Sequence, residues 1–272
     1  VADQTIRRLT DTANAEYQPR WSPDGSTIAY LGTRRTLTSS ETTMEDTHAW
    51  LIDADGGNRR EIGDEVDNRQ RSVGWAADGQ SVYFTVQARG NVHLFRLPVA
   101  GGSPQMMVID RGRVGAWSAA ADGSVAYAFS GPGAPAELYV RGDDGARALT
   151  TLNEEFLAER QVAEVEAFTF DSFDGRSIEA FLTKPVTVDP ASRHPLVVVI
   201  HGGPHGQQGA TFNANAQVYA ARGWATLMVN YRGSTGYGQE LADAIFKDQN
   251  GGEAQDVVAG VDAALDRYRW LD

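Results

Sequence analysis

The chain has 272 residues, and its 36 acidic against 24 basic side chains leave a net charge of −12. Such a surface repels phosphate backbones and anionic lipids, so nucleic acid and membranes are excluded as expected partners. There is no cysteine, which excludes disulfides and thiolate metal sites. The longest apolar run, Leu196–Ile200, is too short to span a bilayer, and a polar stretch rather than a signal peptide follows Val1. We therefore expect a cytoplasmic protein.

The first half of the chain repeats a pattern of an aromatic residue, an Asp-Gly pair and an alternating strand. The pairs lie at 24–25, 78–79 and 122–123, which gives spacings of 54 and 44 residues. Each pair precedes a predicted strand, and each unit has a second one; these strands lie over 26–31, 49–52, 81–86, 94–99, 124–129 and 138–140. Periods of this length are typical of β-propeller blades, in which we expect the repeat aromatics to pack between blades.

Residues 1–150 are therefore predicted to be the C-terminal blades of a β-propeller. Three blades are counted, and residues 1–10 are interpreted as the last strand of a fourth. Propellers close with about 4–8 blades, and three alone would leave raw strand edges. We expect further blades upstream, in agreement with a chain that starts at Val1 rather than at methionine.

After a polar connector at 151–163, which favours a short helix, the pattern changes to that of an α/β domain. Strands are predicted over 165–171 and 177–183 as a hairpin, over 196–200 as a central strand buried on both faces, and over 224–230. A helix is predicted over 212–221. An amphipathic helix opens after 251–252, and its apolar face comprises Val257, Val258, Val261, Leu265 and Tyr268. Residues 164–272 are thus interpreted as the first part of an α/β-hydrolase domain with an incomplete parallel sheet.

The strongest functional motif is His201-Gly-Gly-Pro204, directly after the strand over 196–200. Two glycines can turn amide N–H groups out of the sheet edge, and no Cβ blocks the approach of a substrate carbonyl. In α/β-hydrolases such a loop supplies one donor of the oxyanion hole. The alternative is a tight turn without chemistry. His201 is interpreted as a packed residue that orients the turn rather than a general base, and His205 as an exposed neighbour.

The glycine-rich loop Tyr231–Gly238 is a second candidate. It lacks both the Gly-Lys-Ser/Thr ending of a phosphate loop and the dinucleotide-binding spacing, so a structural role is favoured, with Arg232 anchoring carbonyls or a carboxylate. The chain has no Gly-x-Ser-x-Gly motif, and we expect the nucleophile, acid and base outside it. Three further histidines are interpreted as structural and no metal site is predicted: these are His48, His93 and His194.

Four segments together resemble the prolyl oligopeptidase family of serine peptidases, above all its acylaminoacyl-peptidase branch: Leu196–Gly206, Asn230–Gly238, Asp256–Asp262 and Trp270-Leu-Asp272. The repeats resemble that family's propeller, so the resemblance covers essentially the whole chain. It implies that Gly203 donates its backbone N–H to the oxyanion and Gly202 shapes the turn, with His201, Pro204 and Arg232 in support. It also implies that the serine elbow follows shortly after Asp272 and that no cofactor is used. Tyr231 departs from the family, in which proline is expected before Arg-Gly-Ser.

The resemblance implies part of a cytosolic serine peptidase that cleaves short peptides with acylated or free N-termini. Its expected partners are peptide substrates, the rest of the hydrolase domain and the upstream blades, and a homo-oligomer is left open. This chain by itself is expected to be inactive. Two alternatives stay open: an esterase or dipeptidyl-peptidase on the same fold, and a propeller-based binding protein with a vestigial hydrolase segment.

Overall fold

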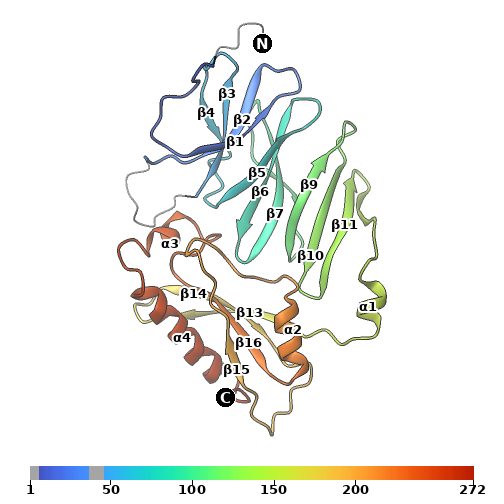
Figure 1. Ribbon diagram of the computed structural model, residues 1–272, viewed down its shortest axis with the longest axis vertical. Helices are drawn as coiled ribbons and strands as arrows, with labels where there is room; N and C mark the ends of the chain where they lie inside the picture. The colour runs from blue at the N-terminus through green and yellow to red at the C-terminus, as the bar shows by residue number, and fades with distance from the viewer. Residues whose placement is uncertain (1–5, 37–45) are drawn as a thin grey trace.

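The computed structural model describes residues 6–36 and 46–272, and Figure 1 shows a fan of β-sheets joined to a mixed α/β layer. The first half forms three four-stranded antiparallel units. The strands of these units are β1 (Glu16–Trp21), β2 (Thr27–Gly32), β3 (His48–Asp53), β4 (Arg60–Ile62), β5 (Gln70–Trp75), β6 (Ser81–Ala88), β7 (Asn91–Pro98), β8 (Gln105–Val108), β9 (Arg113–Ala119), β10 (Val125–Gly131), β11 (Ala134–Gly142) and β12 (Gly145–Ala148).

These units confirm the three predicted blades. The second and third are joined in one sheet only by the parallel pair of Val92 with Arg113, and the fan does not close into a ring in Figure 1. Residues 6–10 pair with no strand in the described part of the chain, so their place as the last strand of a fourth blade stays a prediction. Residues 1–5 lie outside the described residues.

The repeat aromatics pack between neighbouring blades, with one exception. Trp117 of the third blade lies 5.6 Å from the ring of Tyr83 in the second, and Trp75 Nε1 donates to the carbonyl of Arg20 in the first. The apolar faces of the first and second blades share one buried cluster. Trp21 is the exception at 60% exposure, because no further sheet covers β1 among the described residues.

The second half builds one sheet with a helix on each face. After α1 (Glu154–Ala158) come β13 (Val165–Asp171), β14 (Ser177–Thr183), β15 (Leu196–Val198), α2 (Ala214–Ala221), β16 (Ala225–Asn230), α3 (Gln239–Asp243) and α4 (Gly252–Arg267). The strand order is β13-β14-β16-β15, in which only β15 and β16 are parallel. Alternate residues of β14 and β16 face opposite sides, so Leu182 and Leu227 pack toward α4 while Phe181 and Met228 lie in the cluster on the other face, where α2 sits (Figure 1).

The strand over 196–200 differs from its prediction. It is shorter, its residues are only half-buried, and Ile200 is 63% exposed. The reason is that β15 is the outermost strand of the described sheet. Among the described residues, its outer edge is paired only at its start, where Leu196 N donates to the Asp272 carbonyl at 3.0 Å and His194 forms a parallel bridge with Leu271.

Helix α4 is confirmed, and four of the five residues of its predicted face pack against the core: Val257, Val261, Leu265 and Tyr268. Val258 is 61% exposed, and the buried positions form a four-residue series: Gly252, Asp256, Gly260 and Ala264. A Cβ on Gly260 would lie 2.8 Å from Val229 Cγ2. Small residues therefore let the helix approach the sheet closely, while Val257 and Val261 pack at the sides of the contact. None of the described helices is long and apolar enough to cross a membrane.

The two halves meet where the β6–β7 turn touches the loop after residue 206. Gln207 joins them through both ends of its amide: its Oε1 accepts from Gly90 N at 3.2 Å, and its Nε2 donates to the Asn91 carbonyl at 2.7 Å. A Cβ on Gly209 would lie only 1.7 Å from the Gly90 carbonyl oxygen. The two backbones therefore touch without room for any side chain.

We predict that Gly209→Ala destabilises the protein by about 1–3 kcal/mol, because the added methyl must push the two halves apart. Urea unfolding of the purified variant measures the change. Gly142→Ala is the matched control, since a Cβ there meets nothing within 4 Å. Equal midpoints for the two variants would contradict the close contact.

Candidate active site

The turn at 201–206 leaves the sheet at the carboxyl end of β15. Gly203 has φ +134°, and a Cβ at this position would lie 3.0 Å from His205 N, so both its conformation and its surroundings require glycine. Gly202 and Gly203 are both exposed, and Pro204 follows through a cis peptide bond. The turn thus presents bare backbone at the tip of a parallel strand.

The amide N–H groups of this turn differ in what they bind. In the described part of the chain, neither Gly202 N nor Gly203 N donates a hydrogen bond to a protein oxygen, whereas Gly206 N donates to the Pro204 carbonyl at 2.9 Å. An exposed amide without a protein acceptor is free to bind water or an added oxyanion. Two such amides adjoin the end of β15.

The His201 ring lies beneath the turn and is held on three sides. It stacks on Tyr231 with ring centroids 4.4 Å apart, its Nε2 lies 3.0 Å from Ser234 Oγ, and its Nδ1 lies 3.2 Å from the Gly202 carbonyl oxygen. The Tyr231 hydroxyl also donates to the His201 carbonyl. Burial lowers the pKa of His201, so the ring is neutral near pH 7.

His205 is not the exposed neighbour that the sequence suggested. Its side chain is half-buried, with Nδ1 at 2.9 Å from the Gly233 carbonyl, and its own carbonyl accepts from Arg69 Nη1 at 3.0 Å. The turn folds back onto the loop after β16, which covers the ring. Arg69 comes from the propeller half, where it forms a buried ion pair with Asp46 at 3.0 Å.

Sequence reasoning missed Arg69, Gln207 and Ser234 as contacts of the turn. Ser234 lies in the quoted Arg-Gly-Ser motif, but nothing in a linear pattern shows that its hydroxyl faces His201. Arg69 belongs to no repeat signal. The histidines predicted to be structural pack within their own surroundings: His48 lies 3.2 Å from Glu61, and His194 Nδ1 lies 2.8 Å from the Gly223 carbonyl.

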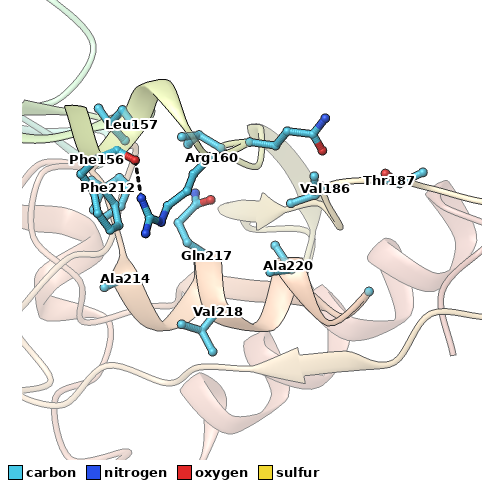
Figure 2. Close-up of a pocket in the computed structure, with 14 residues that line it drawn as sticks. Phe156, Leu157, Arg160, Val186, Thr187, Phe212, Ala214, Gln217, Val218 and Ala220 are labelled. Atoms are coloured by element: carbon cyan, nitrogen blue, oxygen red, sulfur yellow. Dashed lines mark hydrogen bonds between the residues drawn. The ribbon is translucent and has the colours of Figure 1, made fainter. Parts of the chain in front are cut away.

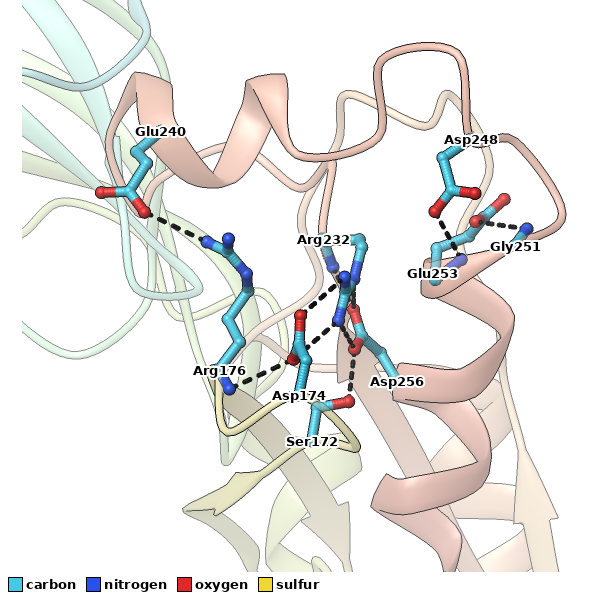
Figure 3. A network of polar contacts seen from close by, with 10 residues as sticks. Ser172, Asp174, Arg176, Arg232, Glu240, Asp248, Gly251, Glu253 and Asp256 are labelled. Atoms are coloured by element: carbon cyan, nitrogen blue, oxygen red, sulfur yellow. Dashed lines mark hydrogen bonds and ion pairs between the residues drawn. The ribbon is translucent and has the colours of Figure 1, made fainter.

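Arg232 contacts carboxylates rather than carbonyls, as Figure 3 shows. Its guanidinium donates to both oxygens of Asp256 at 2.8 and 2.9 Å and to Asp174 at 3.1 Å. The Arg232 backbone N–H donates to the same Asp256 carboxylate, and Ser172 Oγ donates to it at 2.5 Å. These bonds raise the pKa of Arg232 and lower that of Asp174.

Of the cavities near these elements, one adjoins the turn. A cavity of about 280 Å³ is lined by Val199 and Gln207 on either side of the turn and by Gly90 and Arg113 of the propeller half. The larger groove in Figure 2, about 760 Å³, lies between α1 and α2 and contains no residue of the turn. No three metal-ligating side chains gather anywhere in residues 6–36 and 46–272.

We predict that Asp256→Asn lowers the free energy of unfolding by about 3–5 kcal/mol, because Arg232 keeps its charge in a buried site with its main partner neutralised. Asp262→Asn on the same helix is the control. That side chain is exposed, so the control should change stability by less than about 0.5 kcal/mol. Denaturant titration of both variants decides the matter, and similar losses would contradict a special role for Asp256.

The lowered pKa of His201 predicts a loss of stability in acid. The unfolded chain takes up a proton near the ordinary histidine pKa of about 6.5, whereas the folded ring resists protonation until lower pH. The stabilising contribution of the neutral His201 ring is therefore complete above the unfolded-state pKa. It is lost as the pH falls from that value toward the lower pKa of the folded state. Urea unfolding at a series of pH values should show a shallower acid slope for His201→Gln than for the unchanged protein. An identical slope would refute the buried, neutral ring.

The chain is similar to known peptidases in sequence. The model of the prolyl oligopeptidase family matches residues 210–272. An uncharacterised peptidase of Bacillus subtilis, YuxL, is 30% identical over 75% of this chain and 31% of its own length. Dipeptidyl-peptidase 5 of Trichophyton schoenleinii is 26% identical over 95% of this chain and 36% of its own. The chain thus spans about a third of the length of these curated relatives.

The fold is also shared with a solved structure. Pyrococcus horikoshii acylaminoacyl peptidase superposes with a TM-score of 0.85 at 24% identity, over 99% of this chain and 41% of that one. This likeness shows the fold expected from the sequence, propeller blades followed by an α/β-hydrolase domain. The prolyl oligopeptidase family model thus matches the C-terminal end of the chain, and peptidase relatives are similar to it over most of its length.

Proposed function

We propose that this chain is part of a serine-type peptidase that hydrolyses short peptides, of the acylaminoacyl-peptidase or oligopeptidase type. The observation that carries the proposal is the Gly203 amide, which lies at the end of a parallel strand and donates to no protein oxygen in the described residues. Its chemical role is to donate to the carbonyl oxygen of the scissile bond as that oxygen becomes anionic. Gly202 gives the turn its shape, and His201, Pro204 and Arg232 support it.

The rest of the catalytic machinery is proposed to lie beyond these 272 residues. The sequence has no Gly-x-Ser-x-Gly elbow. Residues 270–272 run alongside the start of β15, where Asp272 N donates to the His194 carbonyl at 2.9 Å. A parallel strand continued from there would end at the same sheet edge as β15, beside Gly203. That edge is where a nucleophilic serine and the second oxyanion donor would be needed.

The propeller half is proposed to restrict access to this edge. Its β6–β7 turn contacts the loop after the oxyanion turn, and both halves line the adjoining cavity of about 280 Å³. A site covered in this way favours short or flexible peptides over folded proteins. Residues 1–150 would then be the last blades, 151–163 the connector and 164–272 the first part of the catalytic domain, in a cytoplasmic protein.

The names of the relatives support a peptidase and differ on the bond that is cleaved. One is a dipeptidyl-peptidase and one solved neighbour an acylaminoacyl peptidase. We propose cleavage near the N-terminus of the peptide, which both names have in common. Because the chain has a net charge of −12, we expect that cationic peptides are not repelled electrostatically at the entrance.

The test compares the natural full-length protein with residues 1–272 alone. We expect the full-length protein to release p-nitroaniline from acyl-aminoacyl or dipeptidyl p-nitroanilides and the 272-residue chain to release none. Gly203→Ala in the full-length protein keeps the backbone N–H but is strained at φ +134°, so the amide should turn away from the substrate oxygen. We expect kcat to fall by up to about 10²–10³, the effect of an oxyanion donor that no longer reaches its target. Gly142→Ala, far from the turn, should leave kcat unchanged. Turnover by the isolated chain, or no turnover by the full-length protein, contradicts the proposal.

A further inference from the structure

The Ser234 hydroxyl is buried and has a single partner. The residue is 0% exposed, and its Oγ lies 3.0 Å from His201 Nε2. No other hydrogen bond of this hydroxyl exists within residues 6–36 and 46–272. The adjacent Thr235 is equally buried, but its hydroxyl has no hydrogen-bond partner among the described residues. Two neighbouring buried hydroxyls thus differ only in whether they contact the imidazole.

The contacts of the ring fix which nitrogen carries its proton. Nδ1 lies 3.2 Å from the Gly202 carbonyl oxygen, which can only accept, so Nδ1 must be the N–H donor. In the neutral ring Nε2 is then the acceptor, and the proton in the Ser234 contact must come from the hydroxyl. The Tyr231 hydroxyl lies 3.3 Å from Nδ1, but it donates its hydrogen bond to the His201 carbonyl. It therefore cannot replace Ser234 as the hydrogen-bond donor to the ring.

The Gly202 carbonyl and the Gly203 N–H belong to one peptide group. A planar trans peptide points its carbonyl and its N–H in opposite directions. When His201 Nδ1 holds the Gly202 oxygen on the side of the ring, the Gly203 N–H is turned to the other side, away from the protein acceptors. Glycine has no Cβ to limit rotation of this peptide group. The hydrogen bond to the His201 ring therefore restricts a rotation that the two glycines would otherwise allow.

We propose that Ser234 is a positioning residue for the oxyanion donor. Its hydroxyl holds His201 in the tautomer protonated at Nδ1, the ring holds the Gly202 carbonyl, and that carbonyl aims the Gly203 amide at the substrate oxygen. The inference rests on the proposed function, because it assigns a role within the same site. It predicts that Ser234 acts on the rate of the chemical step and not on peptide binding.

The matched pair Ser234→Ala and Thr235→Val tests the proposal in the full-length protein. Each variant removes one buried hydroxyl at neighbouring positions. Ser234→Ala should lower kcat about tenfold with KM within twofold, a smaller loss than the roughly 10²–10³ of a missing donor. Thr235→Val should change neither by more than about twofold, since its hydroxyl has no partner to lose. Equal kcat values for the two variants overturn the proposal.

A spectroscopic measurement keeps this inference apart from the proposed function. The 272-residue chain labelled with ¹⁵N-histidine contains five imidazoles, and His201→Gln identifies the signals of His201. We expect Nδ1 protonated and Nε2 unprotonated in the unchanged chain and in Thr235→Val, and a mixture of tautomers in Ser234→Ala. A ring protonated at Nε2 in the unchanged chain refutes the proposal whether or not the variants fold. The expected tautomer in a full-length protein that cleaves no peptide would instead reject the peptidase function and leave the Ser234–His201 contact standing.

Discussion

A buried ion pair between Arg232 and Asp256 determines where the functional loops of this protein lie. Its strength comes from complete pairing: the Asp256 carboxylate accepts from the guanidinium, from the Arg232 backbone and from the Ser172 hydroxyl. Taking two charges out of water is costly, and such a pair is tolerated only when nearly every donor and acceptor finds a partner. One carboxylate on α4 therefore joins the end of β16 to the β13–β14 hairpin, and the loop that follows β16 has a fixed origin.

That loop in turn holds the glycine turn after β15. Tyr231 and Ser234 contact the His201 ring, and the Gly233 carbonyl contacts the ring of His205. On its outer side the turn exposes the backbone of Gly202 and Gly203. On its inner side the rings of His201 and His205 are held by the contacts just described. A donor intended for a developing negative charge is useful only if it does not reorient during the reaction, and these contacts supply that rigidity.

The propeller half reaches the same turn from the opposite side. Arg69 donates to the His205 carbonyl, and Gln207 binds the backbone of the β6–β7 turn. Gly90 and Gly209 touch backbone to backbone. The two halves are thus joined by specific polar contacts at the candidate site as well as by the connector at 151–163. A shift of the blades would therefore displace the residues that flank Gly203.

Short-range sequence signals were enough to predict the local units of this protein. Asp-Gly turns with alternating strands predicted the three blades. The hairpin at 165–183, the helix over 212–221 and the turn at 201–204 follow from the same short-range signals, because periodicity and turn chemistry depend on neighbours along the chain.

Which surfaces meet, in contrast, depends on how these units pack in three dimensions. The buried face of α4 is set by small residues that allow close approach, which a count of valines does not reveal. Ile200 is exposed because β15 lies at the edge of the described sheet, although its composition favours burial. The contact of Ser234 with His201 spans 33 residues, and Arg69 reaches His205 across 136; such pairings depend on how the strands and blades are placed in space, which no local pattern encodes.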